Sequence, residues 1–382
     1  EETLAPNSLR LANTYHSISG VFYDRGLLVE ALDLLQIVLA IRERLSPDSL
    51  DVASTYNSIG NVYLYQGKLD QAMELHQKVL EMEERLAPES LTAAHSFNNI
   101  GLVFQEQGRI EESLQQFQRS QAIKVKLAPD SLDLGSTLSN MGRSFQQQGK
   151  VDEALDAYKQ DLAITEKVAP DSVGVAITLN NIGTALKTKG KFKEALEAHE
   201  KAQKILQQLA PVSVELARTL KDKAMVLRRQ QGQLRTALET VKRARSMLEA
   251  PPIGIWKYHP IVLQTMFQQG LLHFDVREYG AALAFANKVL EHLPRSRFGQ
   301  ALRDISTQGL ESWNGSKSGW FGFRKQDDSR EMNPISLDWK VVAEDLGYLV
   351  EEDAFEVEAR RLLYGLEDPE SSKQMHSSTG TS

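Results

Sequence analysis

The sequence predicts an all-α protein, a right-handed superhelical solenoid of antiparallel helix pairs followed by a short C-terminal helical tail. The first observation is a proline that returns every 41 residues, at Pro6, Pro47, Pro88, Pro129, Pro170, Pro211 and Pro252. The second is a glycine near the middle of the first five units, at Gly26, Gly67, Gly108, Gly149 and Gly190. The third is apolar residues spaced three or four apart on either side of each glycine, which is typical of amphipathic helices. A fixed period of this length indicates a repeat array.

Each unit contains two predicted helices, a first helix A and a second helix B. In the second unit we expect helix A over 50–65 and helix B over 69–86, joined by Gln66-Gly67-Lys68. Proline ends the incoming helix, and the Asp or Ser that follows it caps the next one. Glycine suits the left-handed conformation that often ends a helix.

Two columns of small residues predict that the paired helices approach closely. The column in helix A is Ser19, Gly60, Gly101, Gly142, Gly183 and Ala224. The column in helix B is Ala31, Ala72, Ser113, Ala154 and Ala195. Large residues fill the facing gaps, at Tyr15, Tyr56, Phe97, Leu138, Leu179 and Leu220. His76 and His199 share a column with Leu35, Phe117 and Tyr158, so we expect them to be packed rings. His16 and His95 lie on helix A, where they could contact a ligand.

The repeat resembles the tetratricopeptide repeat, and more closely the long-unit version found in kinesin light chains. The likeness is carried by the Asn-Asn-Ile-Gly runs that start at Asn98 and Asn180, by the Gln-Gly-Lys turn, and by the Glu-Ala-Leu that opens helix B at Glu153 and Glu194. The common unit has 34 residues. Seven more residues in helix B are two full turns, which keeps the buried face in phase. The resemblance implies that helix A lines a concave groove that binds protein or peptide ligands.

The chain divides into five segments. We expect six repeats over 1–250, a degenerate terminal repeat over 251–295, a linker over 296–334, a helical segment over 335–367 and a disordered tail over 368–382. In the terminal repeat the helices are predicted over 261–274 and 279–293, with one side facing solvent. Within 335–367, Ser336-Leu337-Asp338-Trp339 is similar to the Leu-acidic-Trp cargo motif that kinesin light chains bind. It either folds back into the groove or anchors the terminal helix.

Composition narrows the function. With 44 Lys and Arg against 51 Asp and Glu, the net charge is −7, which disfavours binding to nucleic acid or to an anionic membrane. There is no cysteine, so cysteine metal sites and thiol nucleophiles are excluded. We find no catalytic motif and no long apolar run, so we expect no enzyme activity, no cofactor, no bound metal and a cytoplasmic location.

Asparagine recurs in the middle of helix A, where it is a mediocre helix former. One column reads His16, Asn57, Asn98, Ser139, Asn180 and Lys221, and the next reads Ser17, Ser58, Asn99, Asn140, Asn181 and Asp222. One turn further along lie Gly20, Asn61, Leu102, Arg143, Thr184 and Met225. One interpretation is a ladder of amides that binds the main chain of an extended peptide. The other is that these side chains join neighbouring A helices, and both can hold at once.

Charge is uneven along the predicted groove. Arg143, Lys187, Arg218, Lys221 and Arg228 make the later repeats basic on an otherwise acidic chain. The earlier repeats offer apolar residues at Leu64, Tyr65 and Leu102. We therefore expect a peptide with an acidic segment at the later repeats, paired with arginine, and a bulky apolar residue at the earlier ones.

Two classes of adaptor remain open. The resemblance implies a cargo adaptor of a microtubule motor, with kinesin heavy chain or motor cargo as partners. The alternative is the repeat sensor or regulatory region of a larger signalling protein. Heptads upstream of Glu1 would favour the first, and a nucleotide-binding domain would favour the second.

Overall fold

The computed structural model describes residues 8–230, 232–250 and 260–292, together with 300, 302–304, 306 and 307. The chain forms two compact units, residues 1–190 (unit 1) and residues 191–382 (unit 2). The described residues contain helices and turns and no strand. None of the described helices has the length and hydropathy needed to cross a bilayer.

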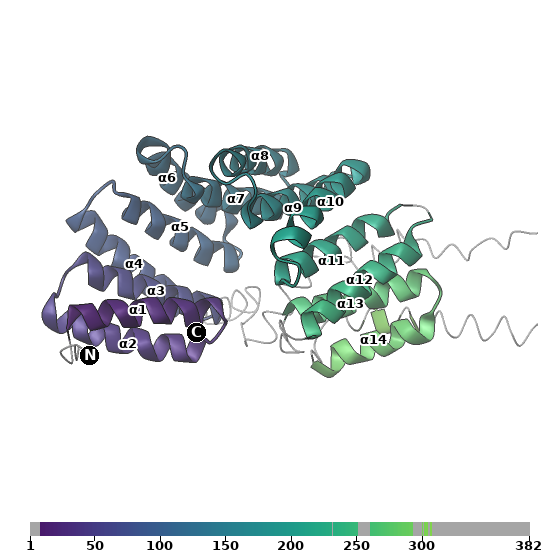
Figure 1. Ribbon diagram of the computed structural model, residues 1–382, viewed down its shortest axis with the longest axis horizontal. Helices are drawn as coiled ribbons and strands as arrows, with labels where there is room; N and C mark the ends of the chain where they lie inside the picture. Colours follow the sequence, from purple (N-terminus) through teal and green to yellow (C-terminus); the bar gives the residue numbers. More distant parts are fainter. Residues whose placement is uncertain are drawn as a thin grey trace, which may run out of the picture. The chain divides into compact units, whose positions relative to one another are not determined.

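Unit 1 is a stack of helix pairs in chain order (Figure 1). Its helices are α1 (Leu9–Asp24), α2 (Leu28–Leu45), α3 (Leu50–Tyr65), α4 (Leu69–Leu86), α5 (Leu91–Glu106), α6 (Ile110–Leu127), α7 (Leu132–Gln147), α8 (Val151–Val168) and α9 (Val173–Thr188). Odd-numbered helices are the A helices and even-numbered ones the B helices. The predicted bounds of 50–65 and 69–86 are confirmed by α3 and α4. Each B helix packs on the A helix of its own repeat and on the next A helix along the chain.

The helix ends follow from the repeated loop residues. The serine after each proline is the N-cap of the A helix, as at Ser49, whose Oγ accepts from the N–H of Val52 at 3.3 Å. The glycine after each A helix has a left-handed backbone, with φ of 73° at Gly67. The N–H of Gly67 donates to the carbonyl of Leu64, which closes the turn before the B helix begins.

The small residues of the A helices are required by the rings of the B helices. A Cβ on Gly60 would lie 2.8 Å from Cε1 of His76, and one on Gly101 would lie 2.6 Å from Cε1 of Phe117. His76 and His199 are fully buried, as expected for packed rings. In the second to fourth repeats, the core is therefore built from rings of the B helices seated on glycines of the A helices.

Unit 2 begins with α10, the B helix of the fifth repeat. Its helices are α10 (Phe192–Leu209), α11 (Val214–Arg228), α12 (Leu234–Glu249), α13 (Pro260–Asp275) and α14 (Tyr279–His292). The bounds of the terminal pair agree with the prediction to within one residue. Residues 261–274 of α13 are all buried, including polar Gln264 and Gln268, and the exposed residues described in this terminal helix pair lie on α14, as at Gly280.

Part of the expected linker is also structured. Residues 302–304, 306 and 307 are helical, and Leu302 and Ser306 are fully buried. A Cβ on Gly270 would lie 2.7 Å from Cδ2 of Leu302, so this helix lies against α13. The rest of the linker, the helical segment over 335–367 with Leu337-Asp338-Trp339, and the tail over 368–382 lie outside the described residues.

Candidate functional site

The asparagines of the A helices form hydrogen bonds between neighbouring repeats. In each case a residue of one column bonds to a residue of the other column 42 positions later. The bonds are Asn99 Nδ2 to Asn57 Oδ1 (2.8 Å), Asn140 Nδ2 to Asn98 Oδ1 (3.2 Å) and Asn181 Nδ2 to Ser139 Oγ (3.2 Å). His16 and Ser58 bond in the same way at 2.9 Å. The interpretation that these side chains join neighbouring A helices is therefore confirmed.

These inter-repeat bonds use only half of each amide. Asn57 and Asn98 accept through their carbonyl oxygens, and among the described residues their NH₂ groups have no partner. Asn99 and Asn140 donate through their NH₂ groups, and their side-chain oxygens have no partner among the same residues. All four side chains are half-buried. Each joined pair thus retains a donor and an acceptor, which is what one peptide group needs.

A second set of polar contacts lies beneath the amides. In four successive interfaces a hydroxyl of an A helix bonds to a charged side chain of the preceding B helix. The pairs are Thr55 with Arg42 (2.8 Å), Ser96 with Glu83 (2.6 Å), Thr137 with Lys124 (2.9 Å) and Thr178 with Asp161 (2.7 Å). We call these the hydroxyl–charge pairs. The charges alternate in sign along unit 1, and all four charged residues are buried.

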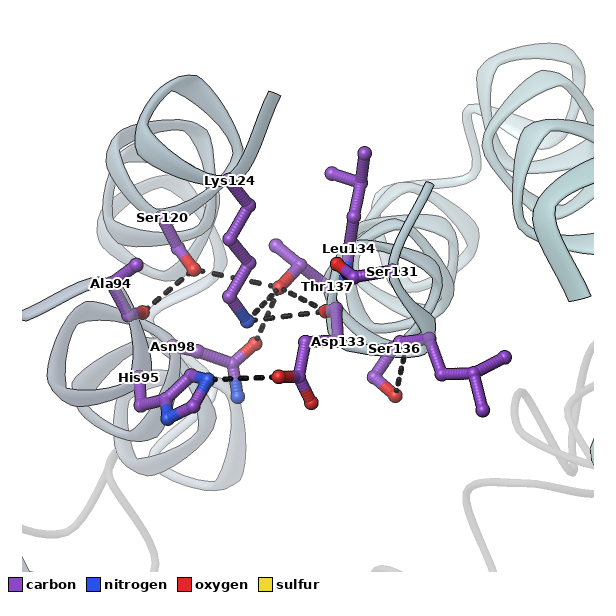
Figure 2. Close-up of polar contacts among 11 residues, drawn as sticks. Ala94, His95, Asn98, Ser120, Lys124, Ser131, Asp133, Leu134, Ser136 and Thr137 are labelled. Carbon is purple, nitrogen blue, oxygen red and sulfur yellow. Dashed lines mark hydrogen bonds and ion pairs between the residues drawn. The ribbon is translucent and has the colours of Figure 1, made fainter. Parts of the chain in front are cut away.

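The third hydroxyl–charge pair shows how the two sets of contacts connect (Figure 2). Lys124 Nζ donates to Thr137 Oγ1 and to the backbone carbonyl of Asp133 (3.1 Å). Thr137 Oγ1 lies 3.3 Å from Asn98 Oδ1, the atom that also accepts from Asn140. The buried lysine therefore holds the hydroxyl that positions one of the asparagines at the surface.

Burial shifts the charged members of these pairs away from their ionised forms. It raises the pKa of Glu83 and of Asp161, although bonds from Ser96 and from Thr178 partly oppose the rise. It lowers the pKa of Lys124 and of Arg42. The pKa of His16 is also lowered, first by burial and then by the nearby Arg42.

The remaining predicted residues of unit 1 have different surroundings. Asn180 is buried, with 6% exposure, and its backbone carbonyl accepts from Thr184. Asn61 is half-buried and lines a cavity between α1 and α3. Arg143 has a half-exposed side chain that donates to Gln105 and lies 3.7 Å from Oε1 of Glu106. Lys187 is half-buried in the last turn of α9.

In unit 2 the predicted basic residues are mostly enclosed. Lys221 is 3% exposed, and its Nζ bonds to Gln264 (2.6 Å) and pairs with Asp222 (3.2 Å). Arg228 pairs with Asp275, and both side chains are largely buried. The expectation that these two residues form a basic groove surface is therefore wrong, because α13 covers that side of α11 and supplies polar partners. Arg218 is half-buried.

Sequence reasoning missed the role of Arg42. Its guanidinium donates to Thr55 Oγ1, to Nδ1 of His16 (2.9 Å) and to Oδ1 of Asn13 (2.8 Å). The available signal was a charged residue at the same position of three successive B helices, at Arg42, Glu83 and Lys124. Such residues are normally assigned to a solvated face, and only the packing shows that this position points toward the next A helix.

Comparisons with known proteins agree with this architecture. A family model described as tetratricopeptide repeat matches residues 10–85, 91–167 and 174–250, together more than half of the chain. No curated protein matches it in sequence. Among the described residues, no group of His, Cys, Asp and Glu could hold a metal ion.

Solved structures that match with a TM-score above 0.5 share the fold. A Rap protein complexed with competence and sporulation factor has a TM-score of 0.56 at 12% identity, covering 76% of this chain and 75% of its own. A signal transduction ATPase with a tetratricopeptide repeat sensor from Pyrococcus horikoshii has a TM-score of 0.56 at 15% identity, covering 78% and 44%. Kinesin light chain-like repeats from Podosopora anserina have a TM-score of 0.44 at 20% identity, covering 53% and 97%.

Proposed function

The chain belongs to the tetratricopeptide repeat family, whose members bind protein or peptide partners, and we propose that it is a non-catalytic adaptor that holds an extended peptide on the A helices of unit 1. The observation that carries this proposal is the half-used amide pair. Asn57 with Asn99 and Asn98 with Asn140 each keep one donor and one acceptor at a half-buried surface.

The spacing of these pairs suits an extended chain. Packed helices lie about 8–10 Å apart, and an extended peptide rises about 3.3 Å per residue, so roughly three residues span one repeat. A donor and an acceptor would therefore meet the peptide backbone about once in three residues. Binding through the backbone gives affinity without a strict sequence, and the side chains between the contacts supply selectivity.

We further propose that the preferred peptide has an acidic segment near α7 and α9. Arg143 and Lys187 place two cations on these A helices. Lys221 and Arg228 do not contribute to this surface, because they are enclosed and paired with Asp222 and Asp275. Reversing the charge of either would leave its aspartate buried beside a second negative charge. Such variants would test folding rather than binding.

A display library of random peptides, selected on the full chain, tests this function. Ser54 and Ser136 are exposed on A helices and make no inter-repeat bond to any described residue. Changing both to Glu therefore adds charge to the proposed surface without breaking an amide pair. We expect selected acidic peptides to lose roughly tenfold or more in affinity. Changing the same two residues to Lys should strengthen binding.

The matched control changes Gln77 and Gln118, which are exposed on B helices, to Glu. This variant should bind the selected peptides as the wild type does. Equal losses in both Glu variants would show that net charge, and not the A surface, decides affinity. A failure to select any peptide would reject the proposed function itself.

The motor-cargo adaptor and the sensor of a larger signalling protein are two forms of this function. Affinity purification from cell extract followed by mass spectrometry separates them by the partners recovered. Recovery of kinesin heavy chain supports the first form, and recovery of a peptide signal or an effector domain supports the second.

A further inference from the structure

A cavity of about 100 Å³ opens between α1 and α3, the first two A helices. Its walls are formed by residues of these two helices and by Leu35 of the B helix α2. The wall residues from α1 and α3 are His16, Ser19, Gly20, Tyr23, Ser58, Asn61 and Val62. The cavity lies in the surface that the proposed function assigns to the peptide.

Gly20 lines this cavity and is itself exposed. It lies inside α1, where glycine is less favourable than almost any other residue, and a Cβ placed on it would meet nothing within 4 Å. Gly60 differs, because a ring packs against it and close approach explains its lack of a side chain. In the other repeats the position of Gly20 carries a side chain, at Asn61, Leu102, Arg143, Thr184 and Met225. The first repeat thus differs from the next five at this position of the A helix.

Most polar groups that line the cavity already form hydrogen bonds with other protein groups. Arg42 donates to Nδ1 of His16, so the other ring nitrogen, Nε2, carries the hydrogen and donates to Ser58 Oγ. Ser58 Oγ in turn donates to the carbonyl of Ser54 (3.1 Å), and Ser19 Oγ donates to the carbonyl of His16 (2.7 Å). No carboxylate, lysine or arginine lines the cavity. An uncharged occupant fits this lining, and a charged one would enter without a counter-charge.

The size of the cavity narrows the occupant further. A cavity of about 150 Å³ is known to hold a benzene ring, so this smaller one suits a branched aliphatic group. The rim also favours an apolar guest, since Tyr23 packs edge-on against Tyr65, whose side chain is half-exposed. Asn61 makes no bond within the described residues and can hold the backbone beside the anchored side chain.

We propose that this cavity is the anchor subsite of the peptide surface and takes one Leu, Ile or Val side chain of the partner. The proposal rests on the proposed function, which supplies the peptide. It restricts the partner to peptides that carry an uncharged aliphatic residue where they contact α1 and α3.

The test fills the cavity with Gly20→Leu. Leucine stands at the same position in α5, as Leu102, and it is a better helix former than glycine, so the variant should be at least as stable as the wild type. We expect peptides selected on the wild type to share an aliphatic residue and to bind Gly20→Leu roughly tenfold or more weakly. Gly280→Leu is the control, because Gly280 is exposed in α14 and a Cβ there also meets nothing within 4 Å.

A second measurement needs no selected peptide. N-acetyl-leucinamide, titrated into ¹⁵N-labelled full chain, should shift the amide resonances of Gly20 and Asn61, whereas N-acetyl-glycinamide and N-acetyl-lysinamide should not. These shifts should disappear in Gly20→Leu and remain in Gly280→Leu. If selected peptides bind but show no aliphatic preference and tolerate Gly20→Leu, the subsite is wrong while the proposed function stands. If blocked leucine causes no specific shift, the subsite is wrong whether or not peptides bind.

Discussion

Replacing His76 by phenylalanine should stabilise the protein, and more so at low pH. His76 is fully buried on Gly60, and neither ring nitrogen has a hydrogen-bond partner within the described residues. Burial lowers its pKa from 6.5 to about 4. Phe117 occupies the same position one repeat later and rests on Gly101 in the same manner, so the site has room for a phenyl ring.

The magnitude follows from the two pKa values. The folded pKa is the lower one, so the unfolded chain binds more protons between about pH 4 and 6.5, and stability is lost as the pH falls through that window. Acidification from pH 8 to pH 5 should cost the wild type about 2 kcal/mol through His76 alone. At pH 8, removing two unsatisfied buried nitrogens should add about 1–3 kcal/mol.

Urea unfolding of the full chain, followed by circular dichroism at pH 8 and pH 5, measures both effects. Other titrating groups also contribute, since the raised pKa of Glu83 and of Asp161 favours the folded state as the pH falls. The difference between His76→Phe and wild type cancels these groups. Hydrogen exchange of the α3 and α4 amides localises the change to this repeat. The reciprocal variant Phe117→His should lose stability and acquire the same pH dependence.

The lowered pKa of His76 is rejected if wild type and His76→Phe lose stability in parallel between pH 8 and pH 5. That result would mean that His76 is not held neutral by burial. A gain that is constant with pH would support the cost of the unpaired nitrogens and reject the lowered pKa.

Three further predictions concern the packing and the polar contacts. Gly60→Ala should destabilise by about 1–3 kcal/mol in thermal unfolding, because the added Cβ would lie 2.8 Å from the ring of His76. Glu83→Gln should raise the melting temperature more at pH 7 than near pH 4, because burial disfavours the ionised carboxylate and raises the pKa of Glu83. A double-mutant cycle of Asn57→Ala and Asn99→Ala, read by urea unfolding, should give a coupling of about 0.5–1.5 kcal/mol.

Each of these has an outcome that would count against it. Gly280→Ala adds a Cβ in open space and is the control for Gly60→Ala, so equal losses in both would point to helix chemistry rather than to the ring. A Glu83→Gln gain that is the same at pH 4 and pH 7 would argue against a raised pKa. Additive effects of the two asparagine variants would mean that the bond between their amides contributes nothing to stability.

The fold was predictable because each repeat carries residues that mark the ends of its helices. Proline, serine and glycine mark where helices end and begin, and the predicted ranges of 50–65 and 69–86 agree with α3 and α4 to the residue. The candidate residues were found by the same alignment of columns. What the columns could not show is that bonds run diagonally, from one column to the other 42 residues later, because that offset depends on how neighbouring A helices are staggered.

The burial of Lys221 in the sixth repeat could not be predicted from the sequence. Lys221 aligns with asparagines of earlier repeats, and nothing in its own helix indicates that α13 encloses it. The cavity beside Gly20 could not be predicted either, because a glycine within a helix does not indicate whether the space beside it is filled. The burial of Lys221 and the cavity beside Gly20 both depend on side chains of the neighbouring repeat. An alignment of repeats compares equivalent positions and does not show which side chains of the next repeat lie against them.

The hydroxyl–charge pairs suggest how a repeat array of this kind can gain repeats during evolution. Threonine or serine can either give or receive a hydrogen, so the same position meets a cation in Arg42 and Lys124 and an anion in Glu83 and Asp161. A duplicated or transposed repeat would therefore find a compatible neighbour whichever sign it carried. A chain built on this junction can gain, lose or reorder modules while the contact between them stays chemically satisfied.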